Sequence, residues 1–215
     1  MKSQDIGVLL KLVSLQRAES ERVITNAEKA WPHDWRDWNE EAEFDYPADL
    51  APADEQALHA RYTARALEQQ TGISKTQINL ALTRCIEIGL AHKDRRLGIP
   101  RANTRALADF IVHGLKYVFP ARPAELTRGI ATGFAAPILR DKLLSAGEYM
   151  LVWPDAHGNS TGQAVEPLFK TAVYAARKDP EIYALLALID AIRLGQPREN
   201  QLAAQLLRKR LDIVK

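Results

Sequence analysis

Apolar residues recur at helical spacing near the start of this chain of 215 residues. Within residues 3–16 they fall three and four positions apart, and Leu12 and Leu15 widen the apolar stripe. This spacing predicts a helix, with Ser3 placed to cap its start. Because both faces of the helix are fairly apolar, we expect it to be buried between other elements or shared with a second subunit.

A tighter pattern over residues 62–91 predicts two helices joined by a turn. Thr63 is placed to cap the first helix and Gly72 to end it. Ser74 is placed to cap the second helix, which Gly89 ends. One face of the second helix is apolar and is expected to point inward; it carries Ile78, Leu82, Cys85 and Ile86. We interpret this region as a helix-turn-helix.

Helical spacing continues in the rest of the chain. It predicts helices over residues 104–118, 172–178, 180–194 and 197–210. Asn103 and Asp179 are placed to cap the first and third of these. Residues 182–194 are almost continuously apolar, so we expect this stretch either in the core or at a dimer surface.

Strand signals are confined to the middle of the C-terminal half. The turn-rich letters PDAHGNST separate two short strand-like segments, 149–153 and 162–167, which predicts a β-hairpin. Residues 119–147 contain several prolines and glycines and are expected to be mostly loop, with a short helix near residues 138–144. The expected fold class is therefore mainly α with a small β-hairpin.

Composition narrows the class of protein. Lys plus Arg number 29 and Asp plus Glu number 27, so the net charge is only +2 and a wholly basic nucleic-acid coat is excluded. The single cysteine, Cys85, permits neither an intramolecular disulfide nor a zinc site of several cysteines. No apolar run reaches the length of about 18 residues that a membrane span needs, and no secretory signal is seen. We expect a soluble, cytoplasmic protein.

Charge is distributed unevenly along the chain. Residues 31–55 hold nine carboxylates against Arg36, together with three tryptophans. They lie within an expected insertion at residues 17–61. This acidic aromatic segment is interpreted either as a loop whose tryptophans complete the local core, or as a cover for a basic surface that tunes DNA access. Residues 74–105 carry the opposite balance, with seven basic side chains against two acidic ones.

The polar face of the second helix carries the candidate chemistry. A helix of this kind fits the major groove, and its N-terminal residues reach base edges. The candidates for base contact are Ser74, Lys75, Thr76, Gln77 and Asn79. The candidates for phosphate contact are Arg84, Lys93, Arg95, Arg96, Arg101 and Arg105.

The run TGISKTQINLALTRCIEIGLAHKD resembles the pattern LGISxSxVSRxLxxLxxxGLI of winged-helix transcriptional regulators, as in the MarR family. The likeness covers about residues 62–94. It implies that residues 74–88 form a recognition helix and that the region after Leu90 forms a wing or its substitute. The expected organisation is a winged-helix-like DNA-binding domain over residues 1–118 and a C-terminal helical α+β region over residues 119–215.

These features together predict a dimeric repressor that binds double-stranded DNA. The C-terminal region would serve dimerisation, or would sense a ligand or a protein partner. The alternative is an adaptor or antitoxin-like protein that uses the helix-turn-helix to bind protein. The five histidines show no metal spacing, and no hydrolase signature or glycine-rich phosphate loop is present. We therefore expect no enzyme activity, no cofactor and no metal.

Overall fold

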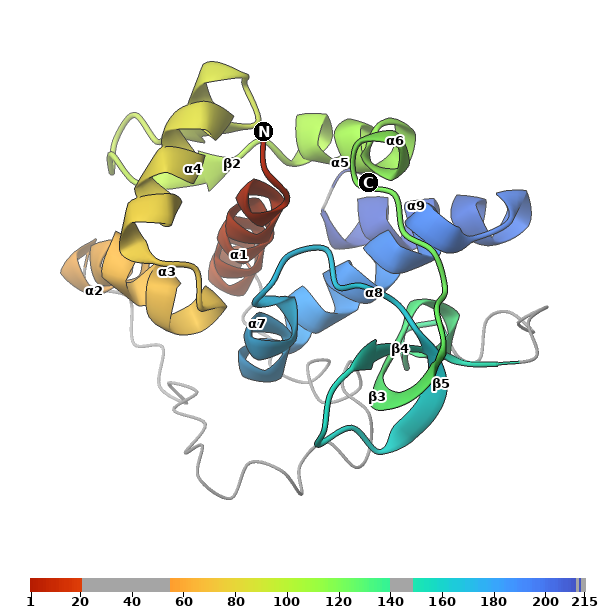
Figure 1. Ribbon diagram of the computed structural model, residues 1–215. Helices are drawn as coiled ribbons and strands as arrows, with labels where there is room; N and C mark the ends of the chain where they lie inside the picture. Colours follow the sequence, from red (N-terminus) through yellow and green to blue (C-terminus); the bar gives the residue numbers. More distant parts are fainter. Residues whose placement is uncertain (21–54, 140–148, 212, 214–215) are drawn as a thin grey trace.

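The computed structural model describes residues 1–20, 55–139, 149–211 and 213. These parts of the chain are mainly helical, with a two-stranded antiparallel sheet and a three-stranded sheet (Figure 1). The elements, in chain order, are α1 (Ser3–Ser20), α2 (Glu55–Arg61), α3 (Ala64–Thr71), α4 (Lys75–Glu87), β1 (Ala91–Lys93), β2 (Pro100–Ala102), α5 (Thr104–His113), α6 (Leu115–Val118), β3 (Leu126–Thr132), η3 (Gly133–Ala135), β4 (Leu151–Pro154), β5 (Ser160–Ala164), α7 (Ala172–Lys178), α8 (Pro180–Leu194) and α9 (Pro197–Arg210).

The apolar helix α8 forms the centre of the molecule. Its bounds are those expected from the sequence, and the Asp179 carboxylate caps it by accepting hydrogen bonds from the backbone N–H groups of Glu181 and Ile182. Every residue from 182 to 192 is buried, and α8 contacts α1, α5, α6, α7, α9, β3 and η3. The core interpretation of this helix is confirmed, because its apolar surface is covered within a single chain.

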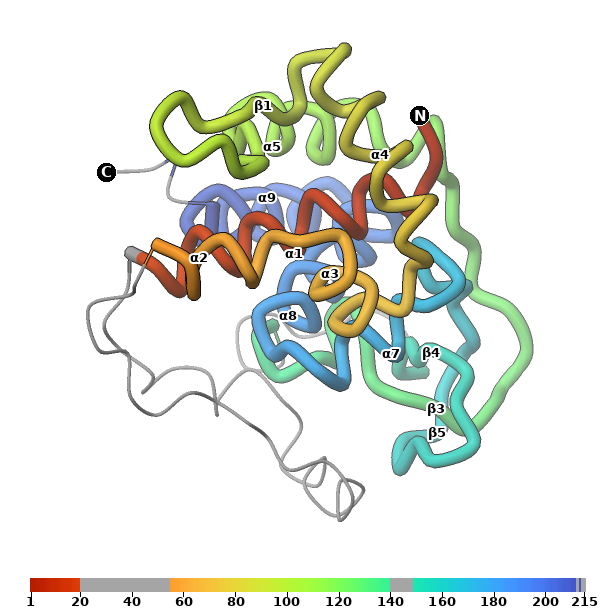
Figure 2. The backbone as a smooth tube through the Cα atoms, turned by 90° about the vertical axis from the view of Figure 1, so that its left-hand side faces the viewer, coloured from red at the N-terminus to blue at the C-terminus, as the bar shows by residue number. Residues whose placement is uncertain are grey.

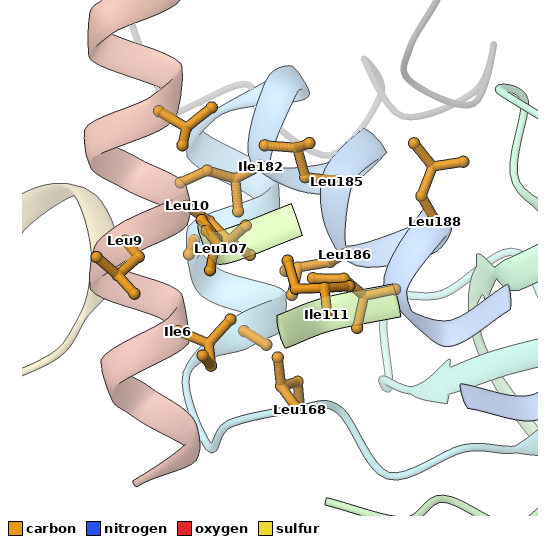
Figure 3. Packing of buried hydrophobic residues seen from close by; sticks show 14 of the residues in the cluster. Ile6, Leu9, Leu10, Leu107, Ile111, Leu168, Ile182, Leu185, Leu186 and Leu188 are labelled. Atoms are coloured by element: carbon orange, nitrogen blue, oxygen red, sulfur yellow. The ribbon is translucent and has the colours of Figure 1, made fainter. Parts of the chain in front are cut away.

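The first helix lies between α8 and the α3–α4 pair. Figure 3 shows Ile6 and Leu10 pointing toward α8, whereas Leu9 points away from it. Residues 5–14 are buried, which confirms that this helix packs between other elements, and α1 continues four residues beyond the expected end. One buried hydrophobic cluster runs from α1 to α9 and crosses the expected domain boundary at residue 118.

The two helices expected within residues 62–91 are present as α3 and α4. The Thr63 hydroxyl accepts a hydrogen bond from the backbone N–H of Ala66, as expected for a cap. Gly72 ends α3 in the left-handed conformation, at φ 68°, which glycine adopts without steric cost. Ser74 occupies the cap position of α4, but its side chain makes no capping hydrogen bond.

The segment after α4 forms an antiparallel hairpin. Strands β1 and β2 pair Ala91 with Ala102 and Lys93 with Pro100. Residues 104–118, expected as one helix, form α5 and α6, because the helix is interrupted at Gly114. The cap expected from Asn103 is present, since its side chain accepts a hydrogen bond from the backbone N–H of Ala106.

The hairpin expected from residues 149–153 and 162–167 is wrong. Strands β4 and β5 pair in parallel with each other, and each pairs antiparallel with β3. β3 itself falls in the region expected to be mostly loop. At Gly129, where β3 passes from one partner strand to the other, a Cβ atom would collide with the carbonyl oxygen of Trp153, so the close approach requires glycine.

Two expectations fall on residues outside the described ranges. The short helix near residues 138–144 lies mostly within 140–148, and the acidic aromatic segment 31–55 lies almost wholly within 21–54. The closing helices α7 and α9 have the bounds expected from the sequence.

Candidate nucleic-acid interface

One side of α4 packs into the protein and the other is exposed. Ile78, Ala81 and Cys85 are buried on the inward side, and burial raises the pKa of the Cys85 thiol to about 12. On the outward side the exposed residues are Ser74, Lys75, Thr76, Asn79, Leu80, Thr83 and the acidic Glu87. Figure 1 shows α4 on the left-hand side of the molecule, and in Figure 2 this side faces the viewer. The helix therefore presents a mostly polar surface outward.

Two side chains of α4 bind it to α1 rather than pointing outward. The Arg84 guanidinium donates two hydrogen bonds to the fully buried Asp5 carboxylate, at 3.0 and 2.6 Å. Hydrogen bonding to Asp5 raises the pKa of Arg84 above its ordinary value. Seven residues earlier in α4, the side-chain oxygen of Gln77 accepts a hydrogen bond from the Gln4 amide at 2.8 Å. These contacts set the orientation of α4 on α1.

The far end of α1 holds the hairpin in place. The Gln16 side-chain oxygen accepts a hydrogen bond from the backbone N–H of Ala102 at 2.7 Å. Glu19 forms an ion pair with Arg101 at 2.7 Å, and the Tyr62 hydroxyl donates to the same carboxylate. Arg101 in turn donates to the Tyr62 hydroxyl at 2.9 Å. Burial raises the pKa of Tyr62, so the phenol stays protonated and keeps its role as a donor.

The hairpin ends in a turn that is ordered by its own side chain. The Asp94 carboxylate accepts hydrogen bonds from the backbone N–H groups of Arg96 and Leu97, at 2.9 and 2.8 Å. These bonds hold the pKa of Asp94 below its ordinary value. Gly98 completes the turn at φ 67°. The turn therefore presents neighbouring arginine side chains from a fixed backbone.

The structure divides the predicted contact residues into two groups. The exposed members are Ser74, Lys75, Thr76, Asn79, Lys93, Arg95, Arg96 and Arg105. The half-buried members, whose side chains bond within the protein, are Gln77, Arg84 and Arg101. Arg96 also approaches Glu55 at 3.1 Å, but both side chains are largely exposed, and a surface pair of this kind contributes little.

Sequence reasoning missed the residues that hold the interface together. Asp5 lies in an otherwise apolar helix, and an acid buried in such a place signals a buried cationic partner. Glu19 and Gln16 gave no such signal, because their partners lie more than 80 residues away in the chain.

Two features of other protein classes were not found in the described ranges. No three His, Cys, Asp or Glu side chains there gather as a metal ion would require. Nor does any described helix combine the length and apolar character of a membrane span.

No protein-family model, no curated protein and no solved structure matches the chain. The function proposed for it stands on the geometry and charge of its own residues.

Proposed function

We propose that this protein is a transcriptional regulator that binds double-stranded DNA in a sequence-specific way. In this proposal α3 and α4 form a helix-turn-helix, α4 is the recognition helix, and β1 and β2 form the wing. One observation carries it: the outward side of α4 is exposed and polar beside a hairpin that carries exposed cationic side chains.

The exposed residues of α4 suit base recognition. Asn79 carries a donor and an acceptor that match the adenine edge, and Lys75 can donate to guanine. Leu80, which is 47% exposed, offers an apolar contact for a thymine methyl group. All three lie in the N-terminal half of the helix, the part that reaches bases in helix-turn-helix complexes.

The hairpin and the start of α5 carry more positive than negative charge, with Asp94 the acidic residue of the hairpin turn. Lys93, Arg95 and Arg105 are exposed cations, and Arg96 has only a solvent-exposed partner. Side chains of this kind contact phosphates and make affinity depend on salt. Arg84 and Arg101 are not assigned to phosphate, because each already neutralises a carboxylate inside the protein.

A dimeric repressor remains part of the proposal, since helix-turn-helix proteins read paired half-sites as two-fold dimers. α8 is buried within one chain, so the dimer contact would have to come from other elements.

A second candidate function is protein binding through the same surface. It is favoured by Leu80 on α4 and by Ile88, which directly follows the helix; they are 47% and 56% exposed. An adaptor or antitoxin-like protein would bury such side chains against a partner.

Fluorescence anisotropy, which measures binding to a labelled duplex, separates the two functions. The duplex is taken from directly upstream of the gene and is about 30 base pairs long, or three helical turns. A regulator should bind with a steep dependence on salt. Lys75→Ala and Asn79→Ala should relax sequence preference by about 1–3 kcal/mol at one base pair, whereas Arg95→Ala should weaken binding to all duplexes alike. Arg198→Ala, at an exposed position in α9, is the control. Absence of binding to the duplex would favour the adaptor.

A further inference from the structure

Helix α7, from the C-terminal half of the chain, packs against the α3–α4 turn. An ideal Cβ on Gly72 would lie 3.0 Å from the ring of Tyr174 and 3.1 Å from Thr171. The Tyr174 hydroxyl donates a hydrogen bond to the backbone carbonyl of Gln69, in the last turn of α3, at 3.0 Å. Both views place α7 beside this turn, on the side of the molecule from which α4 begins (Figures 1 and 2).

The surface of α7 beside the turn is cationic. Lys178 is exposed, and its ammonium group lies 5.0 Å from the centre of the Tyr174 ring, whose hydroxyl contacts α3. Lys170 is exposed and adjoins Thr171 in the chain. The other charges of this helix are neutralised within the protein, since Arg177 pairs with Asp155. Two lysines therefore extend the positive surface beyond the helix-turn-helix.

The placement of α7 matters because of how a helix-turn-helix lies on DNA. Its second helix enters the major groove while its first helix crosses the phosphate backbone. If α4 enters the groove, the end of α3 faces the backbone, and α7 lies next to that end.

We propose that Lys170 and Lys178 bind DNA phosphates flanking the groove that α4 enters, with Tyr174 fixing α7 against α3. This inference rests on the proposed function and adds a contact from the C-terminal half. The ligand is the phosphate backbone of duplex DNA, read without regard to sequence.

The size of the effect follows from counterion release. Each phosphate contact contributes about 0.9 to the slope of log affinity against log salt, which corresponds to about a fivefold gain at about 0.15 M salt relative to 1 M. Loss of two contacts should therefore weaken binding about 30-fold and lower the slope by about 1.8.

The experiment measures anisotropy of the upstream duplex with the full chain over a series of salt concentrations. The variants are Lys170→Gln, Lys178→Gln and the double variant, and Lys75→Ala reports on α4. Arg198→Gln removes one exposed charge from the first turn of α9, which lies on the other side of the molecule from α4 in Figure 1, and is the matched control. Because all four positions are exposed, circular dichroism should show an unchanged fold.

The result expected is a loss of affinity and slope in the Lys170 and Lys178 variants, equal for all sequences, with Arg198→Gln unchanged. If Lys75→Ala alters binding and the Lys170 and Lys178 variants do not, the contact from α7 is refuted and the proposed function stands. A loss of affinity equal to that of Arg198→Gln also refutes the contact from α7, since an equal loss reports only the change in net charge. If the unaltered protein does not bind the duplex at any salt concentration, both proposals fail.

Discussion

Arg84→Ala should destabilise the chain more than Asp5→Ala, although each substitution removes the same ion pair. The Asp5 side chain is fully buried, whereas the Arg84 side chain is 27% exposed. After Arg84→Ala the carboxylate retains the hydrogen bond from the backbone N–H of Lys2, at 2.7 Å, and loses its countercharge. Leaving a buried charge without its partner costs about 3–5 kcal/mol.

The reverse substitution leaves the cation near water. After Asp5→Ala the Arg84 guanidinium can be hydrated, so the cost is close to the net contribution of the lost charge-assisted hydrogen bonds, about 2 kcal/mol. The double variant should be more stable than Arg84→Ala alone, because it removes the stranded charge.

Urea denaturation, monitored by far-ultraviolet circular dichroism, measures the free energy of unfolding for the unaltered protein, the two single variants and the double variant. Arg84→Lys, which keeps the charge but not the two-pronged geometry, is the control and should fall between the unaltered protein and Arg84→Ala. If Asp5→Ala costs as much as Arg84→Ala, the difference in burial does not determine the cost, and the reasoning is refuted.

Three further predictions concern the C-terminal half. Thr132→Val removes a hydroxyl that donates to the buried Asp190 carboxylate at 2.8 Å; urea denaturation should show a loss of about 1.5–3 kcal/mol, and Thr132→Ser, which keeps the donor, should lose less. Gly129→Ala should lower the melting temperature strongly in thermal unfolding, because the added Cβ meets a backbone carbonyl of β4; a melting temperature within a degree or so of the unaltered protein would contradict this close approach. Burial opposes ionisation of Asp179, but the charge of Lys11 and hydrogen bonds to the carboxylate outweigh it and hold the pKa below its ordinary value. The ionised form therefore stabilises the fold above the unfolded pKa of about 3.9, and this contribution is lost as the pH falls through the lower folded pKa. Asp179→Asn should be less stable than the unaltered protein at neutral pH and lose less stability on acidification; parallel stability curves from urea denaturation would contradict this.

Local signals in the sequence located most of the helices. The start of α8 is marked by an aspartate cap and by a proline in its first turn, and its end is marked by Gly195. Each of these signals acts on a helix end only a few residues away. α3 and α4 were located in the same way, from Thr63 and Gly72. Helix caps and helical spacing depend on residues that are close together in the chain, so a single sequence is enough to find them.

Strand pairing could not be obtained in this way. β3 contains small and polar residues and Gly129, a composition that resembles a loop, and its partner strands begin 25 or more residues after it begins. The turn-rich letters between β4 and β5 suggested a direct hairpin, but β3 takes the antiparallel pairing of both strands. Non-local pairing of this kind depends on which backbones approach closely, as they do at Gly129.

The candidate interface was predicted in part for a related reason. A charge count over residues 74–105 treats all cations alike, whereas two of the seven, Arg84 and Arg101, neutralise carboxylates of α1. Their partners are 79 and 82 residues away in the chain, so the count could not reveal the pairing. Exposure, which the structure supplies, separates the side chains that remain available to a ligand.

The single core around α8 has a practical consequence for dissecting the protein. A fragment ending at residue 118 would keep α4 and the hairpin but lose the helix that covers Ile6, Leu10, Leu107 and Ile111, as Figure 3 shows. Those leucines and isoleucines would face solvent, and such a patch favours aggregation. Expression of the N-terminal half alone is therefore expected to give insoluble material. The role of each region is better tested by single substitutions in the full chain than by truncation.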